Sequence, residues 1–452
     1  MVSILNRSVA TACAALLTLV LILPATAQEN ATPNGIADDR ADAYAFTNAN
    51  IYQSDGSFIS GGTLLIRDGR ILEINENTSV PGGFFEIDLS GRYIYPGLID
   101  IYTDYGISEL EREDNNGAAE NLLPSDQAFN INDAIRSNFR ASTVFTHDEE
   151  EREKYRDLGF SAVLSLRPDG IARGTSALIT LGNRNANESI IAPDIAAHYS
   201  LDKGSSAQSM PSSLMGAFAL LRQTYLDAQW FNGQDPRPFT DDSLESWIRI
   251  QALPQIMEVD NWQEALTADR IGDEFNTQYL LKTAGDSYRR ADLMKNTGAT
   301  LIVPIDFPEA PSVEDTLTSD EVSLEVLKHW ELAPFNASIL AENEIPFAIT
   351  SSDGEANFWD SLRMSVKNGL PRQLAIDAIT RVPASILGLT ELVGQLTPNA
   401  LANFLITSGP LFTDDSIILE NWIQGDRYVI NSDYDDREGV YELTIEDQNF
   451  QL

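Results

Sequence analysis

Cysteine is almost absent from this chain, and histidine is nearly as scarce. The 452 residues include one cysteine and three histidines. The cysteine, Cys13, lies in an apolar stretch near the N-terminus that we expect to be removed. The mature chain then has no thiol, which excludes disulfides and thiolate chemistry. A chain of this length can bury a core large enough to fold without them.

Basic residues are also few. Lys and Arg number 30 against 68 Asp and Glu, which gives a formal net charge of −38. Removal of the N-terminal stretch deletes one further cation, Arg7, so −38 − 1 leaves −39. Such a charge argues against nucleic-acid or anionic-membrane partners, because phosphate binding needs clustered Lys and Arg. The acidic runs 148–151 and 433–436 are interpreted as solvated faces or loops.

The N-terminus has the three parts of a Sec signal peptide. Residues 1–7 carry one basic side chain, residues 8–23 are apolar, and a Pro-Ala-Thr-Ala sequence ends at Ala27. We expect cleavage after Ala27 and export to the periplasm or the medium. A retained membrane anchor is the alternative, but the apolar core is short and ends in Ala-x-Ala. Residues 28–43 are polar and acidic and are interpreted as a linker.

Short alternating strands follow the linker. Apolar alternation predicts strands at 44–52, 62–66 and 70–74, and Asp55-Gly56 and Asp68-Gly69 supply hairpin turns between them. We therefore expect a small antiparallel sheet over 44–95.

The middle of the chain, 96–391, has a different period. Apolar runs typical of buried strands alternate with helical segments, which predicts a parallel α/β sheet closed as a TIM-like (β/α)8 barrel. The clearest strands are expected at 160–166, 278–283, 300–305 and 346–350. The clearest helices are expected at 213–231, 286–296, 322–330 and 371–379. Strand patterns return over 392–452, so we expect a β-sandwich built from N- and C-terminal segments.

Two sets of segments, one near each end of this pattern, carry a family resemblance. The N-terminal segments are 62–71, GTLLIRDGRI, and 87–100, IDLSGRYIYPGLID. The C-terminal segments are 350–354, 378–388 and 402–404. Together they resemble the amidohydrolase superfamily, in particular imidazolonepropionase-like enzymes. The resemblance implies a β-sandwich joined to a barrel, and hydrolysis of carbon–nitrogen bonds in cyclic amides or dipeptide-like substrates with a divalent, zinc-type metal.

The metal-binding histidines of that family are missing. In the family, Pro-Gly-Leu-Ile-Asp leads into His-x-His, but here those two positions are Tyr102 and Asp104. Further family histidines end later barrel strands, whereas the expected strands here end at Lys282 and near Asp306. Hydrolysis by a bound metal needs several converging ligands that lower the pKa of water toward about 7. The ligand set is therefore largely absent.

The three histidines do not replace it. His147 is expected in a loop or at the start of a charged helix, exposed to solvent. His198 lies in the insertion-rich middle, and His329 lies on an expected helix beside a tryptophan. We interpret all three as surface or packing residues. No Gly-x-Ser-x-Gly elbow accompanies the serines, which argues against a serine hydrolase.

Four residues remain candidates for the site. Asp353 matches the family aspartate that shuttles the proton, although a carboxylate after a strand also often caps a helix. Asp104 can bind a cation, and Lys282 faces the same mouth; with Asp353 they would form a metal-free polar cluster or a salt-bridged filling of the vacated site. Arg173, in a Gly-bearing turn expected at 167–182, is positioned either to hold a substrate carboxylate or to pair with nearby acids.

Two functions follow from these residues. One is a hydrolase of carbon–nitrogen bonds with a degenerate metal site and a small-molecule substrate. The other is a non-catalytic protein that binds a ligand or serves as partner of a true amidohydrolase. A strand expected near 437–445 would fit half of a split tandem protein completed by a second amidohydrolase barrel, or a strand that docks on its own sheet.

Overall fold

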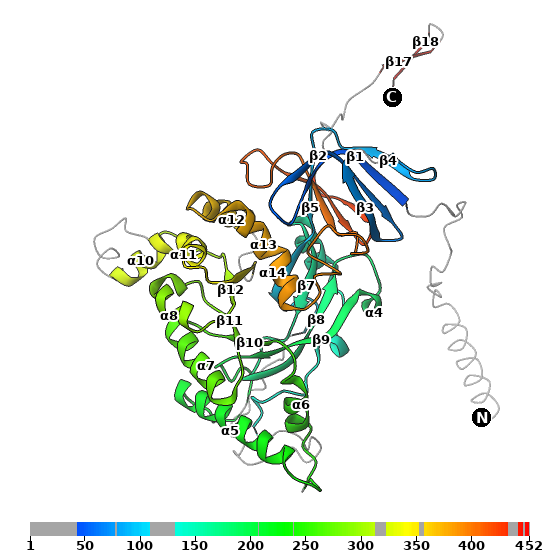
Figure 1. The fold of residues 1–452 in the computed structure, drawn as a ribbon. Helices are drawn as coiled ribbons and strands as arrows, with labels where there is room; N and C mark the ends of the chain where they lie inside the picture. The colour runs from blue at the N-terminus through cyan, green and yellow to red at the C-terminus, as the bar shows by residue number, and fades with distance from the viewer. Residues whose placement is uncertain are drawn as a thin grey trace, which may run out of the picture. The chain divides into compact units, whose positions relative to one another are not determined.

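The computed structural model describes most of the chain after residue 42. The described residues are 43–76, 79–108, 132–206, 208–237, 239–311, 322–351, 357–432, 442–445 and 448–451. They form a mixed α/β fold with two eight-stranded sheets and a separate two-stranded hairpin (Figure 1). The expected signal peptide, nearly all of the linker and the acidic run 433–436 lie outside the described residues. Within the described part, no helix has the length and apolar character that a membrane span requires.

The first sheet joins strands from both ends of the chain. Its strands are β1 (Ala43–Tyr52), β2 (Phe58–Arg67), β3 (Arg70–Glu76), β4 (Phe85–Asp88), β5 (Tyr93–Pro96), β14 (Phe404–Thr407), β15 (Ile418–Ile423) and β16 (Asp426–Val429). β14 pairs antiparallel with β5, and this pairing connects the N-terminal and C-terminal strands. Stacked and edge-on aromatic contacts among Phe46, Phe404 and Trp422, with ring centroids 4.9–5.7 Å apart, fill its core.

The turn between β2 and β3 forms as the sequence predicts. Asp68 and Gly69 both have positive φ, 50° and 72°, which is the geometry of a type I′ hairpin turn. Aspartate and glycine tolerate this conformation better than other residues, so the expected hairpin is confirmed.

The second sheet takes its eight strands in chain order. They are β6 (Leu98–Thr103), β7 (Phe160–Ser165), β8 (Ala172–Thr180), β9 (Ile190–Tyr199), β10 (Gln255–Glu258), β11 (Tyr279–Lys282), β12 (Leu301–Pro304) and β13 (Phe347–Thr350). The four strands expected here are confirmed as β7, β11, β12 and β13. The sheet is not wholly parallel, because β8 runs antiparallel to both β7 and β9.

β8 replaces most of the turn that was expected at 167–182. Only 167–171 precede the strand, and all nine strand residues are buried. Gly174 suggested a turn, but it lies inside the strand with a φ of +78°. A β-carbon there would lie 2.1 Å from the carbonyl oxygen of Phe139, so this glycine marks a close approach of two backbones.

The first and last strands of the second sheet lie next to each other, joined through the buried carboxylate of Asp100 on β6. Thr350 Oγ1, at the end of β13, donates to Asp100 Oδ1 at 2.6 Å. The backbone N–H and the hydroxyl of Ser351 donate to Asp100 Oδ2 at 2.8 Å and 2.5 Å. The sheet therefore curves far enough for its two edges to meet.

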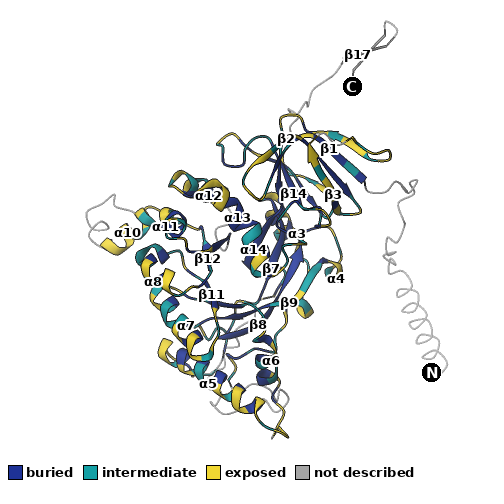
Figure 2. Ribbon diagram, viewed as in Figure 1, coloured by how far each residue is buried: buried dark blue, intermediate teal, exposed yellow. Residues whose placement is uncertain are grey.

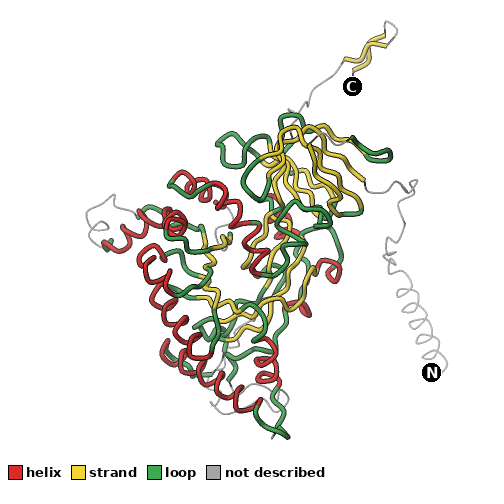
Figure 3. The backbone as a smooth tube through the Cα atoms, viewed as in Figure 1, coloured by secondary structure: helices red, strands yellow, loops and turns green. Residues whose placement is uncertain are grey.

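Helices cover the second sheet (Figures 1 and 3). They are α2 (Ala141–Val144), α3 (Glu149–Asp157), α4 (Ala186–Ser189), α5 (Leu214–Asn232), α6 (Asp242–Ile250), α7 (Trp262–Phe275), α8 (Ala291–Asn296), α10 (Leu324–Leu332), α11 (Asn336–Glu342), α12 (Phe358–Lys367), α13 (Arg372–Ile379) and α14 (Arg381–Ile386). The second sheet and the inner helix faces are largely buried, as Figure 2 shows. The hairpin near the C-terminus pairs β17 (Glu442–Ile445) with β18 (Gln448–Gln451).

The expected helices are found, and their ends follow capping rules. Ser213 accepts a hydrogen bond from Gly216 N at the start of α5, and Ser323 accepts one from Val326 N at the start of α10. The acidic run 148–151 opens α3, where Asp148 caps the helix. Acidic side chains in a first turn are stabilised by the helix dipole, which explains why they cluster there.

α7 carries a carboxyl group whose titration should affect stability. Burial, and then the nearby Asp273, raise the pKa of Asp269 to about 6. A folded-state pKa above the unfolded value means that the native protein gains stability as the pH falls from above 6 to below 4. Because Asp269 is partly exposed, we expect Asp269→Asn to stabilise the protein by only about 1 kcal/mol at neutral pH. Urea unfolding checks this, and the gain should vanish at acid pH, where both proteins are uncharged at this position.

Candidate functional site

Polar side chains from four strands of the second sheet meet at one rim. Tyr102, Glu258 and Lys282 lie at or near the carboxyl ends of β6, β10 and β11. Arg173 lies near the start of β8, which is at the same rim because β8 runs opposite to its neighbours. We call these four residues the rim cluster. The carboxyl ends of strands are where α/β folds usually carry their sites.

Glu258 is the centre of the rim cluster. Its Oε2 lies 2.5 Å from Arg173 Nη1, and its Oε1 lies 3.0 Å from Lys282 Nζ. Arg173 Nη1 also donates to the Tyr102 hydroxyl at 2.7 Å, and Lys282 Nζ lies 5.2 Å from the centre of the Tyr102 ring. The side chains of Arg173, Lys282 and Glu258 are only 5%, 13% and 22% exposed. The cluster is therefore a largely buried ion-pair network.

Mutual contact keeps these groups in fixed charge states. Burial alone would raise the pKa of Glu258, but Arg173 and Lys282 outweigh it and lower that pKa to about 2. Burial lowers the pKa of Arg173, yet Tyr102 and Glu258 more than compensate and leave the pKa raised. Burial raises the pKa of the Tyr102 hydroxyl, so this group stays neutral. The cluster holds two cations and one anion at neutral pH.

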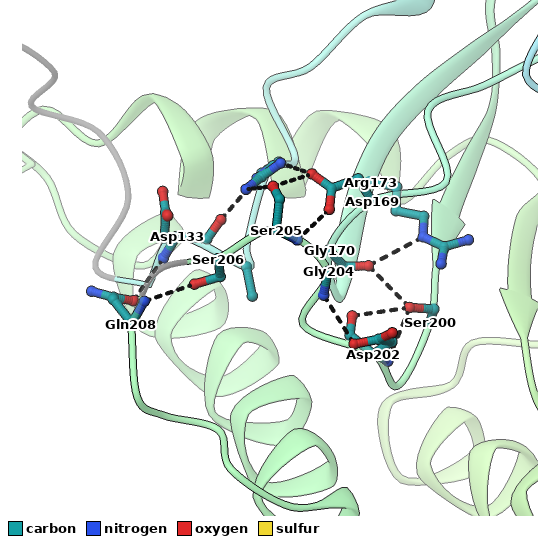
Figure 4. A network of polar contacts seen from close by, with 12 residues as sticks. Asp133, Asp169, Gly170, Arg173, Ser200, Asp202, Gly204, Ser205, Ser206 and Gln208 are labelled. Carbon is teal, nitrogen blue, oxygen red and sulfur yellow. Dashed lines mark hydrogen bonds and ion pairs between the residues drawn. The ribbon is translucent and has the colours of Figure 1, made fainter. Parts of the chain in front are cut away.

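Two neighbouring loops hold Arg173 in place, as Figure 4 shows. Arg173 Nε donates to the carbonyl oxygen of Gly170 at 3.2 Å, and Ser200 Oγ donates to the same oxygen at 3.0 Å. Asp169 accepts hydrogen bonds from Ser205 N and Oγ at 2.6 Å and 2.8 Å, which ties the loop after β7 to the loop after β9. The guanidinium is thus fixed by the backbone as well as by Glu258.

A serine–histidine pair lies below the rim cluster. His198 Nε2 lies 2.8 Å from Ser176 Oγ, and the His198 and Tyr102 ring centres are 5.8 Å apart. Burial, and then Arg173, lower the pKa of His198 to about 3, so the ring is neutral. His198 is 1% exposed and Ser176 is fully buried. A substrate in solvent does not reach this hydroxyl, so the pair packs the interior and does not act as a nucleophile.

The other two histidines bond to nearby hydroxyls. His147 is half-buried, contrary to the expected exposure, because its ring lies between the Tyr105 hydroxyl at 3.3 Å and Ser189 Oγ at 3.2 Å. His329 lies 3.1 Å from the Tyr288 hydroxyl and stacks on that ring. Both fit the packing interpretation made from the sequence.

The structure brings together two of the four candidate residues. Arg173 and Lys282 meet through Glu258, a residue that the sequence reasoning missed. Asp104 follows β6 at the same rim and is exposed. Asp353 lies outside the described residues. Glu258 had one recognisable signal, because it ends a short apolar run and follows the same strand-end pattern as Lys282.

The described residues do not fit the divalent metal that the resemblance implies. Among them, no group of three or more His, Cys, Asp or Glu side chains is arranged to hold an ion. Both oxygens of Glu258 already contact cations, and the Tyr102 hydroxyl is hydrogen-bonded to Arg173. A positive ion placed here would meet Arg173 and Lys282 at close range, which is electrostatically unfavourable.

Comparison with known proteins gives matches to solved structures alone. No protein-family model matches the sequence, and no curated protein matches it. An amidohydrolase from Thermotoga maritima MSB8 is 18% identical with a TM-score of 0.67, covering 85% of this chain and 99% of its own. A Xaa-Pro dipeptidase with bound methionine is 13% identical with a TM-score of 0.52, covering 86% of this chain and 100% of its own.

A third match is a prolidase complexed with N-methylphosphonate-L-proline, 12% identical with a TM-score of 0.51, covering 86% of this chain and 99% of its own. These identities are too low to transfer an activity, but the likeness extends over nearly the full length of each solved chain. The chain therefore shares the fold of these solved proteins.

Proposed function

We propose that this protein is an exported, non-hydrolytic member of the amidohydrolase fold that binds a ligand or a partner protein. In this proposal the second sheet is a variant (β/α)8 barrel and the first sheet is one layer of a β-sandwich. The observation that carries the proposal is Tyr102. It is 7% exposed and hydrogen-bonded to Arg173 inside the rim cluster, and the sequence resemblance places it at the first position of the family's metal motif.

Metal-dependent hydrolysis requires an open coordination position where water is activated and the substrate enters. In the described part of the chain, the four side chains of the rim cluster contact one another and leave no such open position among themselves. Glu258 is engaged by both cations, and the phenol and the guanidinium share a hydrogen bond. These contacts support a rim that keeps its shape without a metal.

Hydrolysis of carbon–nitrogen bonds is the second candidate. The solved structures of similar fold include a prolidase and a Xaa-Pro dipeptidase, which favours a dipeptide-like substrate if activity is retained. Asp104 is exposed at the rim, and Asp353 follows β13 in the sequence. These two carboxylates would then provide an atypical site for a zinc-type ion.

One experiment separates the two candidates. Purified mature protein is dialysed against zinc and manganese, analysed for metal, and assayed on Xaa-Pro dipeptides and cyclic amides beside an Asp104→Ala, Asp353→Ala double variant. We expect no stoichiometric metal and no turnover in either protein. Metal and turnover that are present in the wild type and lost in the variant would overturn the proposal in favour of hydrolysis.

The nature of the partner follows from charge and export. A net charge of −38 does not suit nucleic acid or an anionic membrane, so a small molecule or a second amidohydrolase barrel is the proposed partner. A pull-down from the exported fraction of the source cells, with identification of any captured hydrolase, tests the protein-partner form of this proposal.

A further inference from the structure

We infer that Arg173 and Lys282 replace a divalent metal ion as the positive charge at the rim of the second sheet. This inference rests on the proposed function, because it assumes that the site does not work through a metal. It goes further by assigning the rim cluster a physical task. The two side-chain cations hold Glu258 and Tyr102 together as a bound ion otherwise would.

Charge is the first argument. Arg173 and Lys282 together carry two positive charges, as a divalent ion does, and both lie within 3.0 Å of Glu258 oxygens. Elsewhere in the described chain, ion pairs lie mostly at the surface. Lys295 and Glu344, for example, are 50% and 84% exposed. A buried cluster of this kind costs desolvation energy and is stable only when its geometry is complete.

Position is the second argument. β6, β10 and β11 each bring one member of the cluster to the same rim, and each member contacts another strand's side chain. Lys282 Nζ contacts Glu258 and lies over the Tyr102 ring, and Arg173 Nη1 donates to both the Tyr102 hydroxyl and Glu258. Imidazoles at positions 102 and 282 would therefore converge on the Glu258 carboxylate. Two histidines and one glutamate are a common zinc ligand set.

Replacing the two side-chain cations, Arg173 and Lys282, with a zinc site tests the inference directly. We expect a Tyr102→His, Arg173→Met, Lys282→His triple variant, in which both side-chain cations are removed, to bind one zinc ion per chain in isothermal titration calorimetry with zinc chloride, whereas the wild type binds none. Adding Glu258→Gln to this variant should abolish the binding. A Tyr93→His, Lys295→His variant is the matched control, because it adds two histidines away from the rim and should bind no more zinc than the wild type.

The zinc titrations can also contradict the inference. A folded triple variant that binds no zinc, or zinc binding that survives Glu258→Gln, would overturn the inference. If the triple variant fails to fold, thermal unfolding of the wild type decides the matter. Its midpoint should be the same with EDTA and with added zinc, and a fall with EDTA would overturn the inference. Turnover by metal-free wild type would instead contradict the proposed function and leave the charge replacement intact.

Discussion

Replacing Glu258 with glutamine is expected to lower the free energy of unfolding by about 3–5 kcal/mol, as is typical when one partner of a buried ion pair is removed. Glutamine keeps the size of the side chain but removes the charge that compensates Arg173 and Lys282. Two cations, 5% and 13% exposed, would then lie together without an anion among the cluster residues. Urea unfolding of the wild type and the variant at neutral pH measures the difference.

Glu344→Gln is the matched control. Glu344 also pairs with a lysine, Lys295, at 3.2 Å, but the pair is largely exposed. Exposed pairs contribute little, so this variant should stay within about 0.5 kcal/mol of the wild type. Equal effects of the two substitutions would show that the rim cluster contributes no more than a surface ion pair.

The contribution of Glu258 should also depend on pH in a defined direction. Its folded-state pKa of about 2 lies below the ordinary glutamate value of 4.5. The stabilisation is therefore complete above that ordinary value and is lost as the pH falls from 4.5 toward 2. The difference between wild type and Glu258→Gln should be constant near neutrality and shrink in strong acid. A difference that shrinks already around pH 6 would require a different titrating group.

The fold was predictable in part, because several of its strands have simple sequence patterns. Asp68-Gly69 fixed one hairpin, and the apolar runs that became β7, β11, β12 and β13 are short, continuous and separated by helices. β8 was missed for a physical reason. Its glycine serves a close backbone contact with Phe139, and its buried residues lack the alternation that marks an antiparallel strand.

The site was predictable only in part. Lys282 and Arg173 were identified from their places beside expected strands, yet nothing in the linear sequence shows that they share Glu258. That residue is 24 positions from Lys282 and 85 from Arg173. Parallel pairing of β10 with β11 sets Glu258 beside Lys282, and the reversed direction of β8 brings Arg173 to the same rim. Convergence of this kind depends on strand order and direction, which composition and spacing do not specify.

Asp100→Asn is expected to destabilise the protein by about 3 kcal/mol at neutral pH, because the amide replaces one of two fully buried acceptor oxygens with a hydrogen-bond donor. Asp100 accepts bonds from Thr350 Oγ1, from Ser351 N and Oγ, and from Tyr102 N at 3.0 Å. An amide at this position would turn its NH2 group toward at least one of these donors. The first and last strands of the second sheet would lose the contact that joins them.

Thr350→Val separates this effect from ordinary packing. It removes the Thr350 hydroxyl that donates to Asp100 Oδ1 but leaves the carboxylate and the Ser351 bonds, so a loss of about 1 kcal/mol is expected. Burial raises the pKa of Asp100, although its donors oppose that rise. The native protein then binds the proton more readily than the unfolded chain, so the wild type should gain stability relative to Asp100→Asn as the pH falls. If Asp100→Asn unfolds at the same urea concentration as the wild type, the carboxyl is already protonated at neutral pH, and hydrogen bonding without charge is enough to close the sheet.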